Sequence, residues 1–274
     1  MTNQKTAVAT ATNNSPVTIN SLLGQDGIKK RFEEILGENS AAFISSIISA
    51  TKGNPMLAKC EPNSVVSSAV IAATLNLPIQ NNLGFAAIVP YNSSNGPVAQ
   101  FQMMYKGFIQ LAWRTGQYKT INASAVYAGE LVNYNRLTGE IVIDEKKKTS
   151  NEIVGYCAYF KLINGAEKYL YMNVGQITEH AKRYSKSFSN ASSRWQQDFP
   201  AMALKTVLKM LLSKYGILSV DMQNSVMYDE AVVNDIKGEH FEYVDSTVAN
   251  TPNIENAVVV EEENKGTLPN ANEL

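Results

Sequence analysis

The sequence predicts an α+β fold, in which a helical N-terminal part precedes a curved antiparallel sheet packed against long helices. Apolar residues recur at helical spacing between residues 21 and 77. Short alternating segments bounded by turn residues dominate the middle of the chain, as expected for antiparallel strands. The helical spacing returns after residue 173, and its longest run ends near Tyr215.

Three helices are expected before the sheet, because apolar residues recur every three or four positions and each run ends at Gly or Pro. Asn63 is the expected N-cap of the third helix, since its side-chain oxygen can accept from a free backbone N–H. The expected extents are residues 21–37, 43–53 and 63–77.

The central strands are expected to be joined by tight turns and interrupted by one helix. Asn164-Gly165 is a strong hairpin signal. The helix begins near Tyr105, and Gly116 is expected to end it. The expected strands cover residues 84–91, 98–104, 118–130, 141–143, 153–162 and 168–172.

Two helices are expected after the sheet, at residues 174–185 and 195–215. The pattern also divides the chain into three regions. Residues 1–20 are polar and without periodicity, which predicts a disordered arm, and residues 21–220 are expected to form the core. Residues 221–274 are acidic and poor in aromatics, which predicts a largely flexible tail with one short ordered piece.

Formal charge is distributed unevenly along the chain. Residues 1–97 carry a net charge of +1, residues 98–216 carry +8, and residues 217–274 carry -10. A basic centre attracts a polyanion, and an acidic tail is repelled by the polyanion or competes with it. No segment resembles a signal peptide or the ~18 apolar residues of a membrane span, so we expect a soluble cytosolic protein.

The sequence carries no motif for nucleotide-driven or zinc-dependent catalysis. It has no GxxxxGK[ST] phosphate loop, no HExxH and no CxxC. Cys60 and Cys157 are expected to be reduced, buried thiols, and His180 and His240 are too few for a metal cluster. We therefore expect neither a cofactor nor catalysis. A two-metal nuclease stays open as an alternative, because scattered carboxylates such as Glu130 could converge in the fold.

Basic residues fall into three clusters, two of which are interleaved with aromatic side chains. Cations pair with phosphates, and aromatic faces offer stacking platforms to unpaired bases, so the combination favours single-stranded nucleic acid without sequence preference. The clusters are Lys106, Arg114 and Lys119 with Tyr105, Trp113 and Tyr118; Lys182, Arg183, Lys186 and Arg194 with Tyr184, Phe188 and Trp195; and Lys205, Lys209 and Lys214.

Each cluster also has a purely structural interpretation. A lysine pair four residues apart, such as Lys205 and Lys209, is often the solvated face of a helix. A lone Trp anchors a core more often than it stacks on a base. We expect that role for Trp113, whereas Trp195 is kept as a candidate for both roles. The shared sign of the clusters within one segment of net charge +8 favours nucleic-acid binding.

Specific motifs occur in a recognisable order along about residues 60–216: "SVVSSAVIAATLNLPI", "GFAAIVPY", "QFQMMYKGFIQLAWRTGQY", "INASAVYAGE" and "WQQDFPAMALKTVLKMLLSKYG". Together they resemble the RecT family of phage single-strand annealing recombinases. The matching positions are Tyr105, Lys106, Gly107, Arg114 and Gly116 of one motif, and Trp195, Asp198, Met202, Lys205 and Thr206 of the other. Met104 and Thr115 depart mildly from the family pattern, and nothing beyond Leu218 matches it.

The resemblance implies a protein that binds single-stranded DNA and anneals complementary strands without ATP. It implies assembly into rings or helical filaments, and a fold similar to that of eukaryotic annealing proteins, with a long helix beneath a curved sheet. Family members usually act with a phage exonuclease that exposes the single strand. In the family, the C-terminal region is thought to contact host proteins.

We therefore expect residues 21–220 to be a DNA-binding and oligomerisation core in the cytoplasm of a bacterial host. The expected partners are single-stranded DNA, the annealed duplex intermediate, further copies of the chain, a phage exonuclease and a host single-strand-binding protein. The acidic tail is expected either to mimic DNA or to bind basic host partners. The alternative function is a general RNA-binding assembly protein. The expected DNA contacts are Tyr105, Lys106, Arg114, Lys119, Lys182, Arg183, Lys186, Arg194, Trp195, Lys205 and Lys209.

Overall fold

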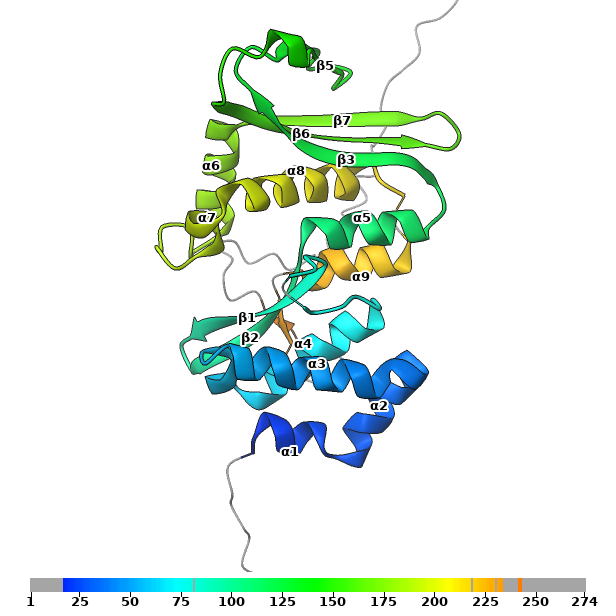
Figure 1. The fold of residues 1–274 in the computed structure, drawn as a ribbon, viewed down its shortest axis with the longest axis vertical. Helices are drawn as coiled ribbons and strands as arrows, with labels where there is room; N and C mark the ends of the chain where they lie inside the picture. Colours follow the sequence, from blue (N-terminus) through cyan, green and yellow to red (C-terminus); the bar gives the residue numbers. More distant parts are fainter. Residues whose placement is uncertain (1–16, 81, 218, 230, 234–240, 243–274) are drawn as a thin grey trace, which may run out of the picture.

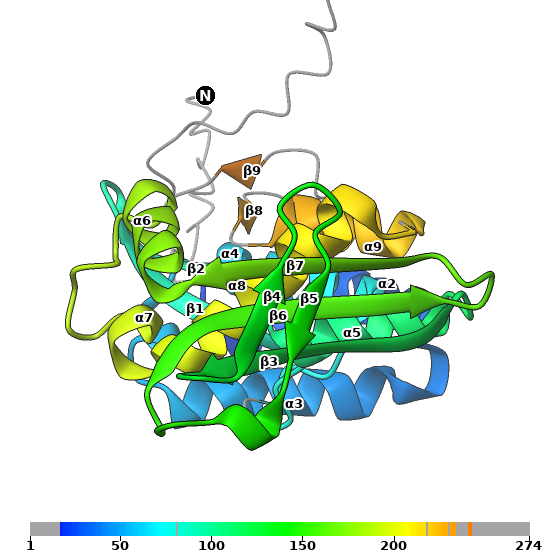
Figure 2. The same cartoon turned by 90° about the horizontal axis from the view of Figure 1, so that it is seen from above.

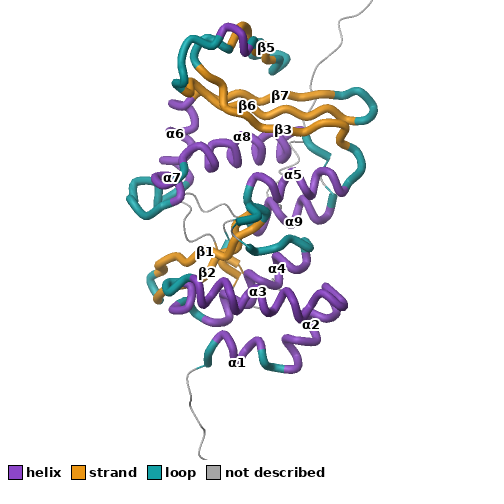
Figure 3. Tube along the Cα trace, viewed as in Figure 1, coloured by secondary structure: helices purple, strands orange, loops and turns teal. Residues whose placement is uncertain are grey.

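The computed structural model describes residues 17–80, 82–217, 219–229, 231–233 and 241–242. Helices and antiparallel strands are both present, which confirms the predicted α+β class. Figure 1 shows the N-terminal helices and a small hairpin at one end of the molecule, and a second sheet with a long helix at the other. Figure 3 shows two helices, α5 and α9, between these two parts.

The N-terminal part is organised around one buried helix, α4. Most of its side chains lie in the core because other helices cover one side and a hairpin covers the other. Glu61 caps α4, since its carboxylate accepts from the N–H groups of Asn63 and Ser64; the predicted cap, Asn63, lies inside the first turn. The elements here are α1 (Ile19–Leu23), α2 (Asp26–Leu36), η1 (Gly37–Asn39), α3 (Ser40–Gly53), η2 (Leu57–Lys59) and α4 (Pro62–Thr74).

The hairpin of β1 (Ala86–Ser93) and β2 (Gly96–Met103) packs on α4. The N–H of Ala99 donates to Ser64 Oγ at 2.8 Å, so the small polar side chains of α4 satisfy a strand backbone that lies directly against the helix. The helix α5 (Tyr105–Arg114) follows β2 and leads into the second part.

The second part contains a three-stranded antiparallel sheet with the order β3-β6-β7. Its strands are β3 (Tyr118–Tyr127), β6 (Ile153–Leu162) and β7 (Glu167–Asn173). Gly165, with φ of +90°, turns the chain between β6 and β7 as the sequence predicted. Strand β7 is an edge strand, because it pairs only with β6 within the sheet.

A second hairpin, β4 (Leu131–Tyr134) and β5 (Ile141–Ile143), is inserted between β3 and β6 and is followed by η3 (Glu145–Lys147). Figure 2 shows it crossing the sheet on the side away from α8. The sequence pattern predicted β5 but not β4. Three of its four residues are exposed, so the strand lacks the apolar alternation that marks a strand in sequence.

Helices after the sheet cover its other face. The elements are α6 (Val174–Tyr184), α7 (Arg194–Gln197) and α8 (Phe199–Tyr215), and α8 contacts all three strands. The predicted single helix from Trp195 to Tyr215 is wrong at its start. The chain breaks at Asp198, whose φ is -151° and whose carboxylate accepts from the Ala201 N–H to cap α8.

The chain returns toward the N-terminal part through α9 (Val220–Tyr228) and β8 (Val232–Val233), and β8 pairs with β9 (Phe241–Glu242). Asp229, Ala231 and Val232 are buried, and β8 contacts α4 and β2. Most of α9 and both strands lie within residues 221–274, where the sequence predicted a largely flexible tail with one short ordered piece. The rest of that tail, apart from β9, and residues 1–16 of the predicted arm lie outside the described residues.

Candidate nucleic-acid interface

The Tyr105-Lys106-Gly107 motif opens α5 and sets how closely this helix approaches the first hairpin. A side chain at Gly107 would overlap the carbonyl oxygen of Phe85, so only glycine permits this contact. The Met104 N–H donates to the same oxygen at 3.0 Å. Lys106 is exposed, and its aliphatic stem passes over Gly84. Tyr105 is half-buried against the core rather than open to a base.

Helix α5 has one buried and one exposed face. Phe108 and Leu111 face the core, whereas Lys106 and Trp113, seven residues apart, share the opposite side. Trp113 is 57% exposed, so the expectation that it anchors the core is wrong. An indole two helical turns from an ammonium group gives this face both a stacking surface and a phosphate-binding charge.

Arg114 has a structural partner at the end of α4. Its Nη1 donates to the Leu75 carbonyl at 2.6 Å and its Nη2 to the Asn76 carbonyl at 2.7 Å. Asn76 has φ of +48°, so the chain turns sharply there and leaves carbonyls that need donors. Arg114 therefore joins α5 to α4, and its charge lies at the negative end of the α4 dipole.

The second basic cluster lies on α6, on α7 and between them. Lys182, Arg183, Lys186 and Arg194 are exposed. Lys182 pairs with Glu179 at 3.3 Å and Arg194 with Asp198 at 3.9 Å, both at exposed positions where ion pairs are weak.

Trp195, in contrast, is only 7% exposed and packs between Phe188 and Phe199, with ring centroids 6.0 and 5.7 Å away. In this arrangement Trp195 anchors the core and offers no face to a base. This outcome matches the structural interpretation of that residue and removes it from the candidate contacts.

The third cluster is mostly internal. Lys205 is 4% exposed, and its Nζ lies 3.0 Å from Asp229 Oδ1. Lys209 Nζ lies 2.6 Å from Asp229 Oδ2, and the Met103 N–H donates to Oδ1 at 2.8 Å. The carboxylate thus joins α8 to the end of β2. Lys205 is not accessible to a phosphate in this arrangement, and Lys209 is half-buried and already paired.

The exposed clusters are not adjacent within one subunit. Figures 1 and 2 place α5 and α6 at opposite ends of the second sheet. Lys119 is exposed on β3 shortly after α5, so it belongs with Lys106. Within the described part of the chain, neither Lys106 nor Lys119 forms an ion pair.

Sequence reasoning missed a set of tyrosines on the face of the sheet away from α8. Tyr159 and Tyr169 are cross-strand partners with ring centroids 4.7 Å apart, and Tyr171 lies 5.5 Å from Tyr134 of the inserted hairpin. The signal was present, since period-two alternation in "YCAYF" and "YLY" places Tyr159, Tyr169 and Tyr171 on one face.

The edge of this tyrosine face carries a polar network. The Tyr159 hydroxyl donates to Glu167 Oε2 at 2.8 Å, and Lys161 Nζ lies 3.2 Å from the same oxygen. Loss of hydration and the contact with Glu167 raise the pKa of Tyr159 to about 12. The hydrogen bonds from Tyr159 and Lys161 lower the pKa of Glu167. Tyr159 therefore stays neutral at physiological pH.

The remaining candidate groups have structural surroundings. Cys60 and Cys157 are free thiols; Cys60 is buried as expected, while Cys157 is half-buried. Burial raises the pKa of Cys60 to about 11. Glu130 is buried and accepts from the Tyr127 N–H at 2.9 Å. His180 packs on Tyr184, and His240 lies outside the described residues.

Two absences among the described residues concern a metal site and a membrane span. The described residues contain no group of three or more His, Cys, Asp or Glu side chains placed to hold a metal ion. None of their helices is long and apolar enough to cross a membrane.

Comparisons with known proteins match most of the chain. The model of the RecT family matches residues 41–244. An uncharacterized protein of Bacillus subtilis (strain 168), YqaK, is 51% identical over 213 residues, which are 78% of this chain and 72% of that protein. Protein RecT of Escherichia coli (strain K12) is 28% identical over 222 residues, covering 77% of this chain and 79% of that protein.

Proposed function

Because the chain belongs to the RecT family of recombination-related single-strand annealing proteins, we propose that it binds single-stranded DNA and anneals complementary strands without ATP. The main observation in support of this function is a set of exposed cations on α5, β3 and α6–α7. These cations lie in a segment of net charge +8 that lacks a nucleotide-binding loop. Pairing of complementary strands is itself downhill, so annealing requires presentation of the bases rather than an energy source.

The first strand is held through its backbone. The phosphate contacts in this proposal are Lys106, Lys119, Lys182, Arg183, Lys186 and Arg194, all of which are exposed. Trp113 stacks on a base beside Lys106. Arg114 and Lys209 support the site by positioning α5 and α8, and the burial of Lys205 and Trp195 supports a purely structural role for both.

Assembly on DNA links the two exposed clusters. Since α5 and α6 lie at opposite ends of the sheet, a strand that leaves one cluster meets the other more readily on a neighbouring copy. A ring or helical filament then holds the strand with its base edges exposed, and Watson–Crick pairing supplies the sequence specificity. In this proposal the protein works in the cytoplasm of a bacterial host with a phage exonuclease and a host single-strand-binding protein.

An annealing assay tests the proposal. Complementary oligonucleotides, one with a fluorophore and one with a quencher, are mixed with the full chain in the absence of ATP. We expect annealing faster than that of the free strands. An annealing rate equal to that of the free strands would refute the function, and shortened DNA in the presence of Mg²⁺ would favour a nuclease instead.

Salt dependence tests the phosphate contacts. The Lys106→Ala/Lys119→Ala variant should reduce the slope of log K against log salt by about 1.4, since each phosphate contact with a single strand contributes about 0.7. The matched control is Lys29→Ala/Lys30→Ala, which removes two exposed lysines from α2 and should leave the slope unchanged. Equal slopes for both variants would refute the assignment. An RNA oligonucleotide at matched salt tests the RNA-binding alternative.

A further inference from the structure

A groove of about 700 Å³ runs along the free edge of β7. One wall is the tip of the β4–β5 hairpin, the floor is β7, and the other wall combines the start of α6 with the end of α8. None of the DNA contacts assigned above lines it.

The fold creates this groove by bringing the inserted hairpin against the edge strand. Gly139, with φ of +77°, is so close to β7 that an added Cβ would lie 3.2 Å from the Tyr169 carbonyl oxygen. The ring of Tyr134 packs on that of Tyr171 at 5.5 Å. The hairpin therefore covers one side of the edge and leaves the side facing α6 and α8 open.

The groove is lined by aromatic rings and by cations. The rings are Tyr134, Tyr169, Tyr171 and Tyr215, and the cations are Arg136, Lys168 and Lys214. Lys168 and Lys214 lie over the ring of Tyr215, with Nζ 5.5 and 5.1 Å from its centroid. Within the described part of the chain, no ion pair neutralises these three cations. The one carboxylate in the lining, Glu179, is bonded to Lys182.

We propose that this groove is a second binding site for unpaired nucleotides of a DNA strand. The bases stack on the tyrosine rings, and the phosphates pair with Arg136, Lys168 and Lys214. A peptide strand adding to the β7 edge would need backbone partners but has no use for three cations, so the lining favours a nucleic acid.

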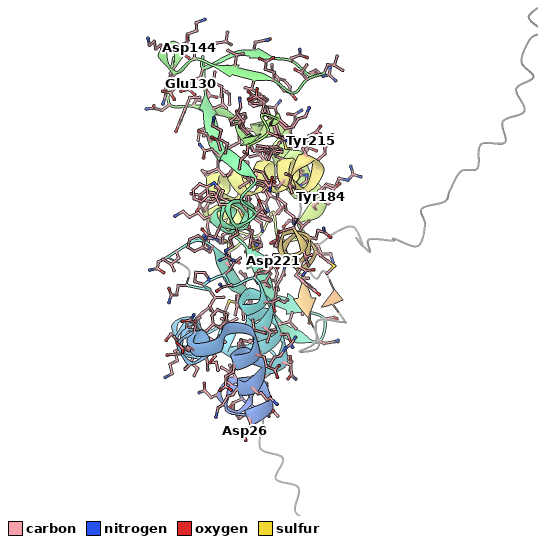
Figure 4. All side chains as sticks on the ribbon, turned by 90° about the vertical axis from the view of Figure 1, so that its right-hand side faces the viewer. Asp26, Glu130, Asp144, Tyr184, Tyr215 and Asp221 are labelled. Carbon is pink, nitrogen blue, oxygen red and sulfur yellow. The ribbon has the colours of Figure 1, made fainter. Side chains whose placement is uncertain are left out.

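The groove also leads toward a cluster already assigned to DNA. Gln176 and Glu179 line its end on α6, and Lys182 follows one turn later on the same helix. Figure 4 shows Tyr184, at the end of α6, and Tyr215, at the end of α8, on the same side of the molecule. A strand in the groove can thus continue along α6 without crossing the sheet. The inference rests on the proposed function and deepens it, because it gives a subunit room for more nucleotides than the α5 and α6 clusters alone.

Photo-cross-linking locates the strand without any substitution. The full chain is mixed with an oligothymidine that carries 5-iododeoxyuridine, irradiated, and digested with trypsin. We expect cross-links in the peptides 120–136 and 169–182, which contain Tyr134 and the pair Tyr169 and Tyr171. Cross-links confined to α5 and α7 peptides would overturn the inference while leaving the proposed function intact.

Substitution gives an independent readout. Arg136→Ala/Lys168→Ala should lower the salt slope by about 1.4, whereas the control Lys146→Ala/Lys147→Ala, on exposed η3 residues outside the groove, should not. Thermal unfolding by circular dichroism checks that both variants fold. If Arg136→Ala/Lys168→Ala keeps the slope and affinity of the unsubstituted chain while Lys106→Ala/Lys119→Ala lowers both, the groove is not a DNA-binding site, and the proposed function stands. Absence of single-strand binding by the unsubstituted chain would instead refute the proposed function.

Discussion

Among the described residues, Asp229 is expected to be the acidic residue whose substitution destabilises the fold most. Its side chain is fully buried and contacts two ammonium groups and one backbone N–H, at 2.6–3.0 Å. Asp229→Ala removes the carboxylate that lies 3.0 Å from the ammonium group of Lys205, whose side chain is 5% exposed. Removing one partner of a buried ion pair costs about 3–5 kcal/mol. The unpaired Met103 N–H adds about 1–3 kcal/mol, reduced where water enters the site.

We therefore expect Asp229→Ala to lose about 4 kcal/mol of the free energy of unfolding, measured by urea denaturation. Small domains have about 5–15 kcal/mol in total, so this loss leaves a marginal fold. Asp229→Asn keeps an acceptor for Met103 and should lose less. The control Asp221→Ala, an exposed carboxylate on the preceding helix, should change stability by about 1 kcal/mol or less.

A double substitution separates charge from packing. Lys205→Met/Asp229→Leu replaces the pair by apolar side chains of similar size, and such replacements are often neutral or stabilising. It should recover only part of the stability that Asp229→Ala loses, because the contacts of Asp229 with Lys209 and with the Met103 N–H are still removed. A loss below about 1 kcal/mol for Asp229→Ala would refute the reasoning, because the lysines would then have found other partners or water at little cost.

Three further outcomes are expected. Trp113→Ala should weaken single-strand binding by about 1–3 kcal/mol without loss of stability, because its ring is exposed. Trp195→Ala should lower the free energy of unfolding by about 3–5 kcal/mol, because its ring is buried. Titration with DNA and urea unfolding measure the two effects, and the reverse pattern would contradict the structure. Burial raises the pKa of Cys60 from 9.0 to about 11. As the pH rises above 9, the thiol therefore loses its proton in the unfolded chain before it does so in the folded chain. The free energy of unfolding should accordingly be constant with respect to this group below pH 9 and decline between pH 9 and pH 11. Native Cys60 should accordingly react slowly with iodoacetamide at pH 8, and rapid labelling of the folded chain would contradict its burial. Truncation after Glu242, which keeps the β8–β9 pair, should leave stability unchanged, and tighter DNA binding by that variant would favour a DNA-mimicking tail. Truncation after Val220 should destabilise the fold because it removes Asp229.

The spacing of apolar residues in the sequence predicted most of the helices and strands, because the apolar residues of these elements are also the buried ones. The strands β6 and β7 were placed within one residue, since one face of each packs on α8, whereas the expected β3 extended three residues beyond Tyr127. The method missed β4, whose side chains are mostly exposed, and it joined α7 to α8. The break at Asp198 is a local cap between two stretches of apolar residues, and apolar spacing alone does not reveal it.

The binding residues were harder to predict because composition does not reveal partners. Lys106 and Lys205 are both lysines within family motifs, yet one is exposed and the other lies at 4% exposure against Asp229. Their difference arises from a contact between residues 24 positions apart, which no local pattern contains. Trp113 could have been assigned correctly, since its spacing of seven from Lys106 places both on one helix face.

The structure explains why α5 and the residues around it carry basic but no acidic side chains. Helix α5 begins without an acidic residue in its first turn and without a side-chain cap, although an N-terminus favours a negative charge. An acidic residue at an exposed position of α5 would lie on the face that carries Lys106 and Trp113 and would repel phosphates. Asp229 instead reaches the end of β2 from the C-terminal region, beneath that face, and two lysines neutralise it there. The backbone at the end of β2 thus has a carboxylate partner, while the exposed face of α5 keeps the cation Lys106.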